Sequence, residues 1–228
     1  MRKIWILTSI IIAINCRCAM AESTIIAIPS ASVVQKNTLI LKESTGYRVF
    51  GSDQFVTIIP RIIYGAGKGI ELSGGVQATI RDEPAVIGRF GVKKVFFTDS
   101  NTKLTFGARV NPDLNESVKS NNLIYSHLTH KINKTNTILV TGIAFLGEDR
   151  RLPNQAGAII GFEQPVVPNK LIFASDWMSG DFGLLSFGFK YRFNPTLSVT
   201  KAISVPNNGD NLLFRFSISK SIPLGNRL

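Results

Sequence analysis

The chain has 228 residues, a formal net charge of +11 at pH 7 and 44% hydrophobic residues. Its only two cysteines, Cys16 and Cys18, lie near the N-terminus, so neither disulfides nor cysteine-ligated metals are expected to stabilise the rest of the chain. The basic excess is compatible with nucleic acid, a membrane surface or an anion pathway as partner.

The first expected element is a secretory signal peptide over residues 1–21. Two basic residues precede the apolar run Ile4–Ile14, and the Ala-Met-Ala sequence at positions 19–21 is the pattern that a signal peptidase recognises. The run is too short for a spanning helix, which needs about 20 apolar residues. Cleavage after Ala21 would leave a mature chain without cysteine and with a formal charge of +8, because Arg2, Lys3 and Arg17 are removed. Export argues against nucleic acid as a partner.

Residues 22–36 contain Pro29 and a run of small residues, and they are expected to form either a periplasmic lead-in or a plug. Beyond them the chain carries about a dozen strand patterns and no convincing amphipathic helix. The expected strands are Asn37–Lys42, Phe55–Tyr64, Ile70–Arg81, Val86–Phe97, Lys103–Val110, Leu123–His130, Thr137–Leu146, Gln155–Glu163, Lys170–Met178, Phe182–Phe193, Thr196–Ile203 and Leu212–Ile222. Thr137–Leu146 and Leu123–His130 are the least regular, because apolar residues occur on both of their faces.

Alternation with a period of two is clearest in the last third of the chain. In Phe182–Phe193, large apolar residues alternate with small or charged ones, and the same pattern returns in Leu212–Ile222. The lengths of the connections between the expected strands alternate too: every second connection is short, and most of the others are longer. Short turns at one rim and long loops at the other are typical of membrane barrels. A repeated apolar face also needs apolar cover, and the remaining sequence supplies little besides lipid.

These features resemble the small outer-membrane β-barrels of diderm bacteria, of porin-like type. The resemblance is one of pattern: a signal peptide, a cysteine-free mature chain and strands that are aromatic-rich near the end. It implies an all-β, antiparallel up-and-down transmembrane β-barrel of about 12 strands over residues 37–228. It also implies outer-membrane lipid and the outer-membrane assembly machinery as partners. Such barrels often end on Phe, whereas this chain ends on Leu228, so an assembly signal would have to be internal to the final strand.

The alternation assigns each strand residue to a face. The aromatic residues expected to face lipid are Phe106, Phe187, Phe189, Phe214 and Phe216. The basic residues expected to face the lumen are Arg81, Lys103, Arg109, Lys190, Arg192 and Arg215, with Arg61, Arg89 and Lys93 as additions and Glu71, Glu163 and Asp176 as the main acids. A charged side chain facing lipid at midplane costs about 2–4 kcal/mol, which favours inward or rim positions for these residues.

No motif predicts an enzyme, a cofactor site or a metal site. Ser126, His127 and His130 are the only place where a hydroxyl and imidazoles gather, but neighbouring strand residues project to opposite faces. His127 and His130 also fall on opposite faces, without carboxylates nearby to complete a zinc site.

The expected function is therefore a passive, porin-like channel whose basic lumen favours small anions. The alternatives are a non-conducting structural or adhesive barrel, in which the same charges form inward salt bridges, and an exported soluble β-sandwich that binds a partner. A barrel of about twelve strands is narrow enough for side chains or an inward segment to fill it. The sequence leaves these alternatives open.

Overall fold

A computed structural model describes residues 24–30, 32–48, 54–81, 83–97, 99–115, 121–148, 155–180, 183–209 and 211–225. The predicted signal peptide lies outside these residues. The strands are β1 (Thr38–Arg48), β2 (Phe55–Gly67), β3 (Ile70–Ile80), β4 (Ala85–Phe97), β5 (Thr102–Val110), β6 (Asn121–Ile132), β7 (Thr137–Glu148), β8 (Gln155–Val167), β9 (Leu171–Met178), β10 (Leu184–Asn194), β11 (Leu197–Pro206) and β12 (Leu213–Pro223).

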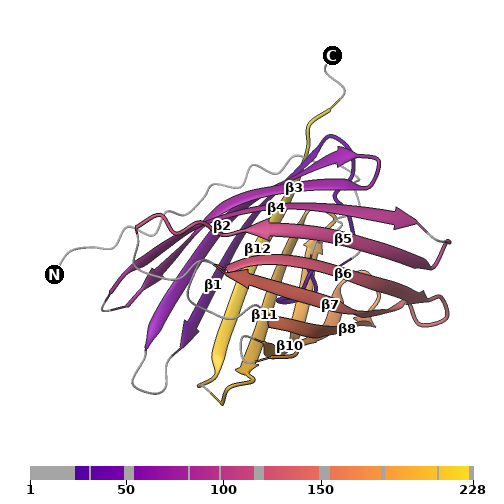
Figure 1. Ribbon diagram of the computed structural model, residues 1–228. Helices are drawn as coiled ribbons and strands as arrows, with labels where there is room; N and C mark the ends of the chain where they lie inside the picture. The colour runs from indigo at the N-terminus through magenta and orange to yellow at the C-terminus, as the bar shows by residue number, and fades with distance from the viewer. Residues whose placement is uncertain are drawn as a thin grey trace.

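Each strand pairs antiparallel with the next, and β12 pairs with β1 to close the barrel (Figure 1). Closure leaves no free sheet edge. The all-β fold and the twelve strands confirm the predicted architecture, and a closed sheet contradicts the two-sheet sandwich alternative. No helix long and apolar enough to cross a membrane is found in the part of the chain described.

The two rims of the barrel differ, as the turn pattern predicts. The connections at one rim, such as that between β10 and β11, have two to four residues, whereas those at the other have four to ten. The two rims are called the short-turn and long-loop rims below. Both the start of β1 and the end of β12 lie at the short-turn rim, where the amide of Leu224 donates to the carbonyl of Asn37.

Individual strand ends differ from the expected ones by a few residues, and β1 differs most. Its segment Glu43–Gly46 carries few apolar residues and was expected to be a loop. In the structure this segment pairs with β2 on one side and with β12 on the other. Ladder hydrogen bonds on both sides hold a weak strand former in place, because tertiary pairing outweighs local propensity.

Burial alternates along the strands, which assigns their faces. In β10, Ser186 and Lys190 are buried inside the barrel, whereas Phe187 and Phe189 are exposed on the outside. In β12, Ser217 is buried inside. A small and polar inner face thus lies back to back with an aromatic outer face, as a barrel in lipid requires.

A pair of substitutions checks this face assignment. Phe187→Arg is expected to weaken assembly in the membrane by about 2–4 kcal/mol, because the new charge would meet acyl chains. Urea titration of the refolded barrel in lipid vesicles measures the loss. Arg215→Ser, on an inner face, serves as the control and should assemble normally. Equal defects in the two variants would mean that the register is shifted by one residue, which exchanges the faces.

Candidate functional site

The lumen has two unlike walls, and the wall formed by β6–β9 is mostly apolar, with His127, Glu163 and Asp176 among its polar residues. Its buried residues form one cluster with two isoleucines from the N-terminal segment: Ile25, Ile28, Leu123, Tyr125, Val140, Ala144, Ile159 and Ala174. This cluster explains the irregular patterns of β6 and β7. Their outer faces meet lipid and their inner faces meet another protein segment, so both faces are apolar.

The segment responsible, residues 24–30 and 32–34, lies inside the barrel. It enters the lumen from the short-turn rim past Gly65, where a Cβ atom would lie 2.0 Å from the carbonyl oxygen of Gln35. It also packs against Gly161, where a Cβ atom would lie 2.3 Å from Cδ1 of Ile25. A side chain at either glycine would collide with the segment, so the barrel wall is shaped to receive it.

Asp176 of β9 holds this segment through the backbone. One carboxylate oxygen, Oδ2, accepts hydrogen bonds from the amides of Ile26, Ala27 and Ile28 at 2.7, 2.6 and 3.0 Å. Three successive amides converging on one anion form a backbone nest. Hydrogen bonds to a charged group contribute about 1.5–3 kcal/mol each, so this contact is a strong attachment.

Lys190 of β10 holds the start of the segment. Its Nζ donates to the carbonyl of Thr24 at 2.7 Å and pairs with Glu163 at 2.5 Å. From β1, three strands away from β10, Lys42 Nζ donates to the hydroxyl of Thr24 at 3.0 Å. Lys42 and Lys190 are both buried, so these contacts form away from bulk water.

Lys93 of β4 holds the later part of the segment. Its Nζ donates to the carbonyls of Ser30 and Ser32 at 3.2 and 2.6 Å and pairs with Glu71 at 3.2 Å. Glu71 in turn accepts the amide of Val34 at 3.2 Å. The inward acids and these lysines therefore attach the segment to the wall.

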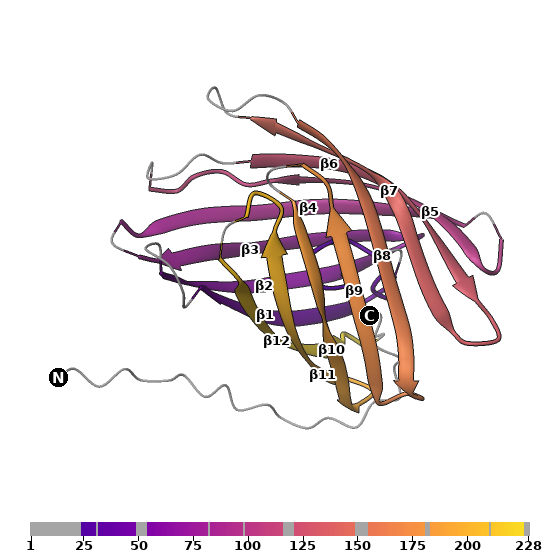
Figure 2. The same ribbon diagram turned by 90° about the horizontal axis from the view of Figure 1, so that it is seen from below.

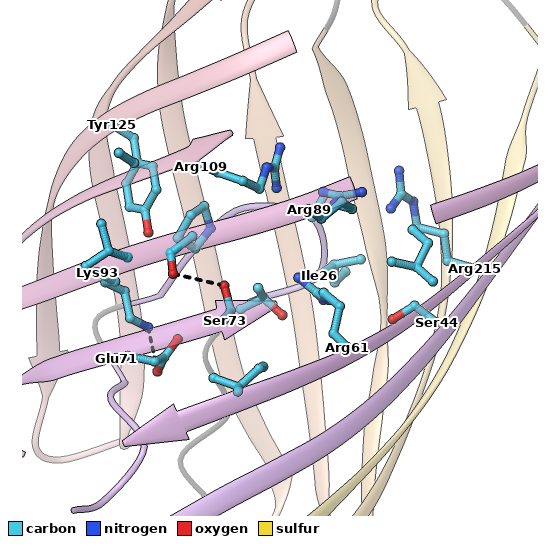
Figure 3. A pocket seen from close by; sticks show the side chains of 18 residues that line it. Ile26, Ser44, Arg61, Glu71, Ser73, Arg89, Lys93, Arg109, Tyr125 and Arg215 are labelled. Atoms are coloured by element: carbon cyan, nitrogen blue, oxygen red, sulfur yellow. Dashed lines mark hydrogen bonds and ion pairs between the residues drawn. The ribbon is translucent and has the colours of Figure 1, made fainter. Parts of the chain in front are cut away.

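The opposite wall is basic. Arg61 of β2, Arg89 of β4, Arg109 of β5 and Arg215 of β12 line a cavity of about 110 Å³ between this wall and residues 24–29 (Figure 3). Tyr125 closes one side, and Ile26 points into the space from the segment. We refer to the four arginines as the arginine wall.

Glycines on neighbouring strands make room for these long side chains. The register pairs Arg61 and Arg89 with Gly75, Arg109 with Gly91, and Arg215 with Gly46. A Cβ atom on Gly75 would lie only 2.7 Å from Cγ of Arg61. The glycines let the guanidinium groups lie along the wall, which keeps space open beside them.

Three members of the arginine wall have only neutral partners or none among the described residues. Arg89 Nη1 donates to Oε1 of Gln77 at 2.6 Å, and Arg215 Nε donates to Oγ of Ser204 at 2.8 Å. The Nε of Arg109 is buried without a hydrogen-bond acceptor there. All four arginines line the same cavity of about 110 Å³, so their charges lie close together. Like charges held this close in a low-dielectric barrel repel one another, and an anion between them would relieve that repulsion.

Of the basic residues predicted to face the lumen, Arg109 and Arg215 lie in this wall, together with the additions Arg61 and Arg89. Lys190 faces inward but is engaged with Glu163 and the segment. Lys103 and Arg192 lie near the short-turn rim, where Lys103 Nζ is 5.3 Å from the ring centre of Phe97.

Arg81 does not face the lumen, and this prediction needs correction. It follows the end of β3, is exposed, and donates from Nε to the carbonyl of Glu83 at 2.9 Å. The alternation of apolar and polar residues continues in the sequence to Arg81, whereas the pairing of β3 with its neighbours ends at Ile80. Pro84, which lacks an amide hydrogen, stands in the connection that follows.

The predicted lipid-facing aromatics all lie on outer faces. Phe106, Phe187 and Phe189 are exposed. Phe214 and Phe216 are half-buried, and the ring of Phe214 stacks on that of Tyr47 at 5.4 Å.

Ser126 and His127 are on opposite faces of β6, so they form no catalytic pair. His127 is 1% exposed and faces the lumen, where its Nδ1 lies 3.3 Å from the hydroxyl of Thr129. His130 lies near the rim beside Thr102. Within the described residues, no group of three His, Cys, Asp or Glu side chains gathers to bind a metal.

The structural role of Asp176 and of Ile25 and Ile28 was not foreseen from the sequence. A signal existed, because β6 and β7 carry apolar residues on both faces. Such strands need apolar cover from inside the barrel, and the apolar stretch Thr24–Ile28 was available to supply it.

Comparison with solved structures finds porins of similar fold. The KdgM porin aligns with a TM-score of 0.61 at 8% identity over 80% of this chain and 99% of its own. The NanC porin aligns with a TM-score of 0.59 at 13% identity, covering 79% and 98%. The chain has the fold of a porin-like outer-membrane β-barrel. A KdgM porin in complex with disordered oligogalacturonate also aligns with this barrel, with a TM-score of 0.56 at 8% identity over 81% and 99%. No protein-family model and no curated protein matches the chain.

Proposed function

We propose that this porin-like barrel is a passive channel of the bacterial outer membrane and that its lumen favours small anions. The arginine wall is the observation that carries the proposal. Arg89, Arg109 and Arg215 face one cavity and form no salt bridge with any described residue. Charge that is already balanced would not attract a solute, whereas a concentrated excess of positive charge lowers the energy of an anion in the pore.

The position of the N-terminal segment supports a route along the arginine wall. The segment packs against the apolar wall of β6–β9, and the cavity lies on its other side. An anion would therefore pass between the segment and the guanidinium groups. A ligand of the similar KdgM porin, oligogalacturonate, is an acidic sugar chain, which agrees with an anionic solute.

Reversal potentials in planar bilayers test the proposal. With a salt gradient across the membrane, the purified full-length barrel is expected to give a reversal potential of the sign set by chloride. A potential of the sign set by the cation would leave the pore intact but contradict the role of the arginines.

A non-conducting structural or adhesive barrel is the second candidate, and the segment inside the lumen is the observation that favours it. The same bilayers separate the two functions, because a filled barrel would show no conductance at any voltage. Such a result would overturn the channel proposal.

A further inference from the structure

The outer face of the barrel carries two charges where a lipid-facing wall should be apolar. Glu43 of β1 and Lys201 of β11 are both exposed, and both belong to the outward set of their strands. Glu43 pairs in register with outward Ile218, and Lys201 with outward Phe216. They therefore belong to the lipid-facing surface and not to the lumen.

Both charges lie in the middle of their strands. Glu43 is five residues from either end of β1, and Lys201 is four residues from the nearer end of β11. At about 3.3 Å per residue and a tilt of about 40°, four residues span about 10 Å of height, which is beyond the reach of a lysine stem. A lysine at the bilayer midplane costs about 2–4 kcal/mol, and an acid costs less.

The other outward charges of the described strands differ in position. Lys94 and Lys220 lie three residues from the short-turn end of β4 and β12. Each donates a hydrogen bond at that rim, Lys94 to the carbonyl of Lys68 and Lys220 to the hydroxyl of Thr196. Glu43 and Lys201 form no hydrogen bond or ion pair with a described residue, so no such contact offsets the cost of placing their charges against lipid.

Glu43 and Lys201 flank β12 at nearly the same height. The register line runs from Lys201 through Phe216 to Thr45, and Glu43 is two residues from Thr45 toward the short-turn rim. Because the strands tilt, residues paired in register lie progressively closer to the long-loop rim in the direction from β11 to β1. For example, Ser204 is two residues from the long-loop end of β11, whereas its partner Leu213 is at the end of β12. Glu43 lies two residues nearer the short-turn rim than Thr45, and this offset brings it back to about the height of Lys201 in the membrane.

The two charges are too far apart to pair within one chain. Two strand spacings of about 4.8 Å and a two-residue offset of about 6.6 Å separate their backbones by about 12 Å. A two-fold axis along the membrane normal relates two copies at the same depth in the membrane, so the β1 side of one copy faces the β11 side of the other. If this axis passes beside Phe216 and Ile218 of β12, Glu43 of each copy faces Lys201 of the other.

We propose that the barrel pairs with a second copy of itself through the outer face of β11, β12 and β1. The surface is self-complementary, as an isologous dimer requires: two reciprocal Glu43–Lys201 ion pairs flank an apolar centre formed by Phe216 and Ile218. Pairing removes both charges from lipid contact. The proposal is independent of whether the lumen conducts.

Cysteine cross-linking in lipid vesicles tests the arrangement directly. In a full-length background with Cys16→Ser and Cys18→Ser, the double variant Glu43→Cys, Lys201→Cys is expected to form a covalent dimer on mild oxidation. An intrachain disulfide is excluded, because a disulfide joins Cα atoms no more than about 7 Å apart. The control pair Phe106→Cys, Ile143→Cys lies on the outer faces of β5 and β7 and should stay monomeric.

Charge exchange provides the second arm. Glu43→Lys should weaken dimerisation at least about tenfold by opposing like charges, and Glu43→Lys with Lys201→Glu should restore it, which excludes a folding defect as the cause. Equal weakening in the single and exchanged variants would overturn the proposal, as would the absence of a cross-link.

Discussion

Replacing Arg89 and Arg109 together by serine is expected to remove most of the anion preference that we propose for the barrel. These two guanidinium groups face the same cavity, and neither has a carboxylate partner among the described residues. Their charge is therefore available to a passing ion. The reversal potential under a salt gradient should move toward zero by about half or more of its original value.

The matched control removes the same charge from the rim. Lys103→Ser with Arg192→Ser deletes two positive charges near the short-turn rim, where water screens them. This variant should keep most of the anion preference. Arg89→Lys with Arg109→Lys keeps the charge and should keep the preference as well. If the rim and wall variants shift the potential equally, net charge sets selectivity and the arginine wall has no special role.

Asp176→Ala is expected to release the N-terminal segment from the lumen and to raise the single-channel conductance severalfold. The substitution leaves the amides of Ile26, Ala27 and Ile28 without their acceptor inside the barrel. Each unsatisfied buried donor costs about 1–3 kcal/mol, so the loss at three amides favours release of the segment into water. Single-channel recording measures the conductance, and labelling of Ala27→Cys by a water-soluble maleimide reports whether the segment has left.

Two controls separate release of the segment from a change of charge. Asp99→Ala removes an acid in the turn between β4 and β5 and should change neither conductance nor labelling. Deletion of residues 24–34 should reproduce the conductance of Asp176→Ala. Higher conductance without labelling would show that the lost charge of Asp176 acts on the ion directly. Unchanged conductance would make the segment a permanent lining.

The faces of the strands were predictable because lipid contacts one side of the wall only. Phe187 and Phe189 alternate with Ser186 and Lys190, and the closed sheet places the aromatic pair outside. Turn lengths carried independent information, since adjacent connections alternate between two different rims. The two-residue alternation along the strands and the alternation of short and long connections together predict a barrel without any specific motif.

The site was less predictable because the alternation of residues shows which face a side chain is on but not which groups it contacts there. It places Lys190 and Arg109 on the same inner surface. It does not show that Lys190 binds the segment while Arg109 has no described acceptor, since this depends on contacts between residues more than a hundred positions apart. The outward position of Glu43 was missed for a different reason, because Glu43–Gly46 was expected to be a loop and pairs as part of β1 in the structure.

The attachment of the N-terminal segment also constrains the order in which the barrel forms. The segment is synthesised before Asp176 and Lys190, which hold it and follow about 150 residues later. Its binding site, formed by Glu163, Asp176 and Lys190, does not exist until β8, β9 and β10 are paired. These strands lie across the lumen from β2 and β3 (Figure 2). Contacts of such long range form slowly, because the loop entropy is lost before they form. Residues 24–34 are therefore expected to be among the last to reach their places, after the wall that holds them has formed.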